Sequence, residues 1–164
     1  MTSCNRFFIL LSALLLLLSS CSPTVETRAA QDSFSVTEAL ANAFPIEGGY
    51  AAYDENALRL YFRDAPLLAQ DFSVIYSVRP DDYTEIGVFR VADDKYRRTV
   101  AREVNAYLEE FKETYLPQAE LYDKNQKVKL SDAALRIIDS YVIYTVMSEK
   151  EQRLFWKNAE SLLL

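Results

Sequence analysis

The chain has 164 residues, of which 50% are hydrophobic and 13% aromatic, and its formal net charge is −6. This composition can bury a core and excludes a disordered chain, and the acidic balance argues against a nucleic-acid partner. The sequence contains no histidine, and its two cysteines are Cys4 and Cys21. Histidine-dependent catalysis and imidazole zinc sites are therefore excluded.

The N-terminal residues predict export from the cytoplasm. Arg6 precedes an apolar run from Phe7 to Leu18, and Ser19-Ser20-Cys21 follows. A basic residue, a short apolar segment and small residues before a cleavage point are typical of a secretory signal peptide. The run is shorter than the roughly 20 residues that span a bilayer as a helix.

The segment Leu18-Ser19-Ser20-Cys21 is similar to a bacterial lipobox, which predicts that Cys21 carries a lipid. We therefore expect a signal peptide at 1–20, a flexible tether at 21–33 and a single domain at 34–164. Loss of Arg6 with the signal peptide leaves a net charge of −7, because −6 minus one basic residue is −7. That charge argues against adhesion to anionic lipid, so the covalent lipid is expected to attach the protein. No thiol then remains free for catalysis.

The first part of the domain predicts two short amphipathic helices. Ser35–Glu38 has the spacing of a capping box and predicts a helix through Phe44, which Pro45 ends. Gly48-Gly49 predicts a turn, and Asp54 is a candidate cap for the second helix.

A β-hairpin is predicted next. Apolar and polar residues alternate from Phe72 to Val78, which is the period of a half-buried strand. Pro80–Asp82 predicts the turn, and Thr84–Val91 the partner strand. Gly87 inside that strand indicates a bulge or a close approach of another backbone.

The longest predicted helix begins after Asp93-Asp94 and runs to about Tyr115, where Pro117 is expected to end it. Its polar face has two interpretations, a bipolar docking face or an ordinary solvated face. This face carries basic residues first and acidic residues later: Arg97, Arg98, Arg102, Glu103, Glu109, Glu110 and Glu113.

The C-terminal part repeats the hairpin–helix order. Lys127–Leu130 is a candidate edge strand, and Leu135–Asp139 with Tyr141–Met147 predict a second hairpin. Ser148–Glu151 is a capping box that opens a last helix through Leu162. We predict an α+β, two-layer fold, in which two hairpins form an antiparallel sheet and the long and C-terminal helices pack on one face, with short N-terminal helices added.

Several of these segments also resemble a known family. The strand TEIGVFRV that leads into the long helix, Tyr115-Leu116-Pro117, and Ser140–Tyr144 before the last helix are similar to a family of bacterial lipoproteins catalogued as a domain of unknown function. The resemblance covers about residues 35–160. It implies a signal peptide, a lipobox, a tether and this fold, and it supplies no catalytic or ligand-binding residue.

Two residues are candidates for a binding surface. Glu85 is an acid on an apolar strand, and it either has a functional role or pairs with Arg79 or Arg90. Trp156 is expected to lie beside the buried face of the last helix and to be partly exposed, either as a contact residue or as a cover of the core edge. That buried face is predicted to comprise Leu154, Phe155, Ala159 and Leu162.

These features favour a lipid-anchored, extracytoplasmic, non-enzymatic binding or accessory module of a bacterial cell envelope. The alternative is a carboxylate-dependent hydrolase of envelope polymers, which needs two acids facing one cleft. We expect no catalytic residues, no cofactor and no metal. The expected partners are the membrane, through the lipid on Cys21, and an envelope protein or glycan, but no nucleic acid.

Overall fold

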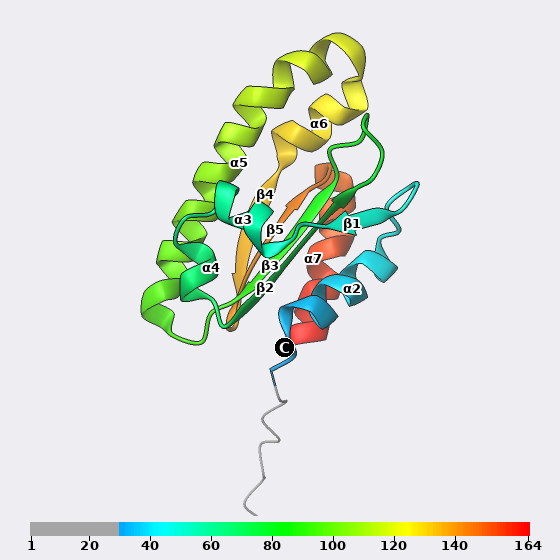
Figure 1. Cartoon of the computed structure of the whole chain (residues 1–164). Helices are drawn as coiled ribbons and strands as arrows, with labels where there is room; N and C mark the ends of the chain where they lie inside the picture. Colours follow the sequence, from blue (N-terminus) through cyan, green and yellow to red (C-terminus); the bar gives the residue numbers. More distant parts are fainter. Residues whose placement is uncertain (1–29) are drawn as a thin grey trace, which may run out of the picture.

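The computed structural model of the protein describes residues 30–164 (Figure 1). The predicted signal peptide, the lipid-attachment residue Cys21 and most of the predicted tether lie outside these residues. Within residues 30–164, no helix combines the length and the apolar character needed to cross a membrane.

Five antiparallel strands form one sheet in the order β1-β2-β3-β5-β4. The strands are β1 (Tyr50–Ala52), β2 (Asp71–Ser77), β3 (Glu85–Arg90), β4 (Ala134–Ile138) and β5 (Tyr141–Val146). The two predicted hairpins are confirmed as β2–β3 and β4–β5, and they join through β3 and β5. Strand β1 was not predicted, because it is only three residues long, and it pairs at one edge of the sheet.

Helices cover both faces of this sheet (Figure 1). They are α2 (Ser33–Ala43), α3 (Glu55–Tyr61), α4 (Ala65–Leu68), α5 (Asp94–Tyr122), α6 (Lys124–Asp132) and α7 (Glu149–Leu163). The face that packs against α3, α4, α5 and α6 is called the front face, and the face that packs against α2 and α7 the back face.

The α+β class and the antiparallel sheet are confirmed, but the prediction that the long and C-terminal helices share one face is wrong. Alternate residues of β5 belong to two separate cores, with Val142 and Tyr144 in the front core and Tyr141 and Ile143 in the back core. All residues of β5 are buried. A strand with apolar side chains on both faces requires a helical layer on each side.

Two predicted boundaries in the C-terminal half are also wrong. Helix α5 continues through Pro117 to Tyr122. Proline removes only one backbone donor, and the packing of Leu116 and Ala119 on the front core holds the rest of the helix in place. Lys127–Leu130 lies in helix α6 and not in an edge strand. The Asp123 carboxylate accepts the backbone N–H of Asn125 at 2.8 Å and caps this helix.

The N-terminal boundary of the domain also differs from the prediction. Helix α2 begins at Ser33, capped by the Asp32 side chain, which accepts the Ser35 backbone N–H at 2.9 Å. The Tyr141 hydroxyl donates to the Gln31 carbonyl at 2.5 Å. The ordered domain therefore includes Gln31 and Asp32, so the prediction that the tether extends to residue 33 is wrong. The predicted caps Asp54, Asp93 and Ser148 and the Gly48-Gly49 turn are confirmed.

Candidate functional site

Glu85 is the one acidic or basic residue that is fully buried in residues 30–164, with 1% of its surface exposed. It begins strand β3 and points into the front core, on the same face of the strand as Gly87 and Phe89. The neighbouring strands pair it with Tyr76 of β2 and Val146 of β5. A carboxyl group in the middle of a sheet is costly to bury unless hydrogen bonds replace its water.

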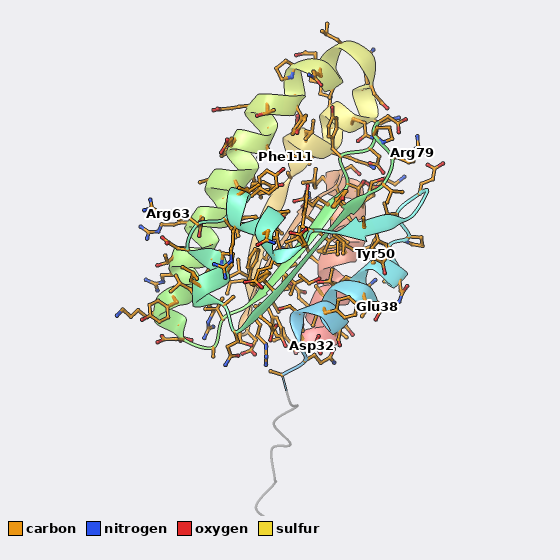
Figure 2. The ribbon with its side chains drawn as sticks, viewed as in Figure 1. Asp32, Glu38, Tyr50, Arg63, Arg79 and Phe111 are labelled. Carbon is orange, nitrogen blue, oxygen red and sulfur yellow. The ribbon has the colours of Figure 1, made fainter. Side chains whose placement is uncertain are left out.

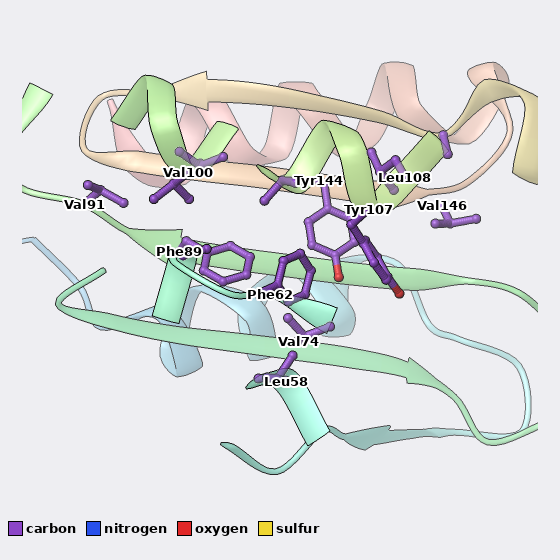
Figure 3. Packing of buried hydrophobic residues seen from close by; sticks show 14 of the residues in the cluster. Leu58, Phe62, Val74, Phe89, Val91, Val100, Tyr107, Leu108, Tyr144 and Val146 are labelled. Carbon is purple, nitrogen blue, oxygen red and sulfur yellow. The ribbon is translucent and has the colours of Figure 1, made fainter. Parts of the chain in front are cut away.

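Three tyrosine hydroxyls from three different segments supply these hydrogen bonds. Tyr107 of α5 and Tyr144 of β5 donate to Oε1 of Glu85 at 2.9 and 2.5 Å. Tyr53, which follows β1, lies 3.5 Å from Oε2. Figure 3 shows Tyr107 and Tyr144 next to each other between α5 and the sheet, and their ring centroids are 5.8 Å apart. We call Glu85 with these tyrosines the Glu85 cluster.

Gly87 makes room for this cluster. It pairs with Tyr144 across β3 and β5, and a Cβ atom at Gly87 would lie 1.9 Å from Cε1 of the Tyr144 ring. The ring therefore lies over the glycine and brings its hydroxyl to Glu85. Both predicted alternatives at Gly87 are wrong: the pairing is regular, without a bulge, and the close neighbour is the Tyr144 side chain and not another backbone.

The environment of Glu85 changes its protonation. Burial raises the pKa of Glu85 to about 7, although the hydrogen bonds from Tyr144, Tyr107 and Tyr53 act in the opposite direction. Burial, and then the negative charge of Glu85, raise the pKa values of Tyr107 and Tyr144, so both stay neutral donors. The cluster can therefore hold or release one proton near neutral pH.

The predicted arginine partners of Glu85 lie elsewhere. Arg79 pairs with Asp81 at 2.8 Å and Glu47 at 3.0 Å, and Arg90 pairs with Asp71. Glu85 is also not part of a surface. The prediction that it belongs to a binding surface is wrong, because the three tyrosines and the strands on either side enclose it.

Trp156 is not partly exposed as predicted, because only 3% of its surface is accessible. It packs in the back core at right angles to Phe155, and its indole N–H donates to Oε1 of Gln152 at 3.2 Å. Leu154, which was assigned to the buried face, is 54% exposed. The buried face of α7 is thus rotated toward Gln152 and Trp156, so Trp156 is a core residue and not a contact surface.

An open groove of about 720 Å³ lies where the C-terminal end of α2, the β2–β3 loop, α6 and the start of α7 meet. We call it the distal groove. Its lining combines apolar and charged side chains, among them Phe44, Ile46, Asp82, Lys129, Met147 and Leu154.

The Lys129 ammonium at the groove donates to Asp82 at 2.8 Å and to the Thr84 hydroxyl at 2.7 Å. Burial raises the pKa of Asp82, but the hydrogen bonds from Lys129 and Thr84 outweigh burial and hold the pKa below its usual value. The Asp82 carboxylate therefore stays ionised, and its ion pair with Lys129 fixes α6 to the β2–β3 loop.

No group of three or more Cys, Asp or Glu side chains in residues 30–164 is placed to hold a metal ion.

The sequence pointed to Glu85 but not to its partners or to the distal groove, because both depend on segments far apart in the chain. Gly87 was the one local signal, since a glycine inside an apolar strand marks a crowded place.

Comparison of the chain with protein-family models, curated proteins and solved structures found no match. The resemblance to the lipoprotein family therefore stays a prediction.

Proposed function

We propose that the protein is a lipid-anchored, non-enzymatic binding module of a bacterial cell envelope, and that it holds a segment of a partner protein in the distal groove. The observation that carries this proposal is the position of the groove. It lies at the opposite end of the domain from the place where the chain enters.

Figure 2 displays this separation, with Asp32 at the entry and Arg79 beside the groove. Helix α2 leads from the end where the chain enters, at Ser33, to the end that carries the distal groove, at Ala43. The proposed lipid on Cys21 precedes Gln31 by ten residues (31 − 21). Ten residues span at most about 36 Å. A short tether of this kind keeps the entry end near the membrane and directs the groove away from it.

The lining of the groove favours a protein segment over a glycan as the occupant. Glycan sites commonly use aromatic faces, and Phe44 is the one aromatic residue that lines this groove. The charged lining residues are four acids and two bases, namely Glu47, Asp82, Asp123, Glu151, Arg79 and Lys129. Apolar contacts with an acidic excess complement an extended segment that carries apolar side chains and a basic residue.

The hydrolase alternative has less support from the geometry. A glycosidase needs two carboxyl groups about 5 to 9.5 Å apart across a substrate cleft. The hydrogen-bond partners of the buried Glu85 are tyrosine hydroxyls, and the cluster is closed to a substrate. The acids at the distal groove are held in a cap, a capping box and ion pairs.

The anchor is tested by growing cells that express Cys21→Ala with a palmitate analogue. We expect no label on the variant and full label on the wild-type protein, because the lipid is carried by that sulfur. Label that persists in Cys21→Ala contradicts the anchor.

The groove is tested by panning a peptide display library against the purified full-length protein. We expect enrichment of segments that combine apolar and basic residues, and loss of their binding in Leu154→Asp. The control is Leu60→Asp, because Leu60 is 84% exposed on α3, away from the groove. Equal binding by the two variants, or enrichment of acidic segments, would contradict the groove as the binding site.

A further inference from the structure

Four basic side chains form one exposed surface on the N-terminal half of α5 and the segment before α4. Lys95, Arg98 and Arg102 are spaced by three and four residues, so they lie on one face of α5. Arg63 joins them because its backbone N–H donates to the Glu103 carboxylate of the same helix. We call these four residues the basic surface. Figure 2 shows Arg63 pointing outward from the domain.

The side chains of the basic surface are accessible, and they are unpaired in the part of the chain that the structure describes. All four side chains are exposed, and none has an ion-pair partner within residues 30–164. The adjacent acids mostly have other partners. Asp93 caps α5, Asp94 pairs with Arg97, and Glu103 accepts three backbone N–H groups at the start of α4. Asp64 is the neighbouring acid whose carboxylate makes no such contact.

Apolar side chains accompany the charges. Leu67 on α4 is 65% exposed, and Tyr96 lies partly exposed next to Lys95, whose Nζ is 5.4 Å from the ring centroid. Basic residues next to exposed leucine and tyrosine are the combination that proteins use at the headgroup region of a membrane.

This surface lies at the end where the chain enters the domain. The turn between β4 and β5 connects helix α5 to the entry of the chain. Arg97 of α5 donates to the Asp139 carbonyl of this turn at 2.6 Å, and the Tyr141 hydroxyl donates to the Gln31 carbonyl. In Figure 1 the entry and the first turns of α5 lie at the same lower end, opposite α6. The chain therefore enters the domain, at Gln31, on this side of the molecule.

We propose that the basic surface faces the membrane and contacts anionic lipid headgroups, so that the anchored domain is held in one orientation. The inference rests on the proposed lipid anchor and adds the surface and the lipid chemistry. It also gives the charge order along α5 a role, since the basic half faces the lipid and the acidic half faces away.

The acidic half of α5 opposes this arrangement little. At physiological ionic strength the Debye length is about 8 Å, so acids at the far end of α5 are screened from the lipid surface. The anchor also raises the effective concentration of the domain at the membrane, so a weak contact is sufficient to orient it.

The test uses the full-length chain, expressed and lipidated in bacteria and reconstituted into vesicles. One set of vesicles contains phosphatidylcholine alone, and the other contains equal parts of phosphatidylcholine and phosphatidylglycerol. The mature protein would carry no free thiol, so Leu67→Cys and, separately, Val128→Cys each give one site for a fluorophore that spin-labelled lipid quenches. Val128 lines the distal groove and reports on the other end.

We expect quenching of the Leu67→Cys probe in anionic vesicles, its loss in neutral vesicles, and no quenching of the Val128→Cys probe in either. The triple variant Arg63→Glu, Arg98→Glu and Arg102→Glu is expected to lose the quenching. Lys124→Glu, Lys150→Glu and Lys157→Glu make the same charge change away from the basic surface and are expected to keep it. Salt that shortens the Debye length to about 3 Å should also abolish quenching of the Leu67→Cys probe in the protein without the Arg→Glu changes. This measurement tests the charge contact without any charge substitution.

Flotation with neutral vesicles separates the two proposals. A protein that fails to float lacks its anchor, which overturns the proposed anchoring and this inference together. If the protein floats but its Leu67→Cys probe is quenched equally in both kinds of vesicle, the orientation by the basic surface is overturned and the anchor stands. The same holds if the two triple variants lose quenching equally.

Discussion

The two cores on either side of the sheet are built from different chemistry. The back core, between the sheet and helices α2 and α7, is formed mainly by aliphatic side chains together with Phe155 and Trp156. The front core contains Phe62, Phe89, Tyr107 and Tyr144, and the last two donate to the buried Glu85 carboxyl. The same sheet therefore has one face whose buried core contains no carboxyl group and one whose core includes a titrating carboxyl group.

This difference predicts where stability depends on solution conditions. Apolar burial is insensitive to protonation, whereas a buried acid links the folding equilibrium to pH. Substitutions in the back core should lower stability by the same amount at every pH, and substitutions in the Glu85 cluster should change the pH profile itself.

The largest expected effect is in the back core. Trp156→Ala should lower the free energy of unfolding by about 3–5 kcal/mol, because it removes a fully buried large side chain. The loss should be equal at pH 5 and pH 8, as measured by urea denaturation. Leu154→Ala, on the exposed side of the same helix, should lower it by less than about 1 kcal/mol. A loss that varies with pH would show that the two cores are coupled.

Glu85→Gln should remove a pH-dependent part of the free energy of unfolding of about 3 kcal/mol. The pKa of Glu85 is about 7 in the folded protein against an ordinary 4.5, so the folded state holds a proton that the unfolded state releases between these values. The contribution of Glu85 to stability is therefore full below pH 4.5 and lost as the pH rises to about 7. Each pH unit in this window is worth about 1.4 kcal/mol.

The measurement compares the two proteins by urea denaturation across the window from pH 4.5 to 8. The wild-type protein should lose stability relative to Glu85→Gln as the pH rises, and the variant should be the more stable above pH 7 if its hydrogen bonds are retained. A constant difference between the two would contradict the titration of Glu85 in this range.

Gly87→Ala should destabilise the protein by about 1–3 kcal/mol, because the new methyl group overlaps the Tyr144 ring. A displaced Tyr144 also donates less well to Glu85, so the pH transition should move to higher pH. The Gly87→Ala substitution should be tolerated better in a Tyr144→Ala background, where the ring is absent. Additive effects in this double-mutant cycle would exclude the steric contact as the cause.

The smallest expected effect belongs to Tyr53→Phe, since its hydroxyl lies 3.5 Å from Glu85. The loss should stay below about 1 kcal/mol, because a hydrogen bond of that length is weak. It should appear mainly above pH 7, where the ionised carboxylate needs donors. The corresponding Tyr107→Phe, at 2.9 Å, serves as the comparison and should lose more.

The sequence predicted the elements whose signals are local. The alternation around Val74 and the capping box at Ser148 each predict an element through neighbouring residues, and these elements are confirmed. Pro117 and Lys127–Leu130 misled the prediction. Packing of Leu116 and Ala119 outweighs the helix-breaking tendency of proline, and four alternating residues are too few to separate a strand from a short capped helix.

The candidate site was less predictable because its contacts join distant segments. Glu85 stood out as an acid on an apolar strand, but Tyr107 and Tyr144 follow it by 22 and 59 residues. Neither tyrosine has a neighbour in sequence that indicates that its hydroxyl meets Glu85. The orientation of α7 was misjudged for the same reason, since both Leu154 and Trp156 are compatible with an apolar helix face until the neighbouring α2 is placed.

The pairing of β3 with β5 has a consequence for the order of folding. Each hairpin can form from residues close in sequence, but Glu85 lies on the first and Tyr144 on the second, and α5 and α6 separate them. Closing such a long loop is slow compared with forming a hairpin. Either hairpin alone leaves the carboxyl in water. Glu85 therefore loses its water only when the two halves of the sheet dock, which makes its dehydration a late event in the assembly of the domain.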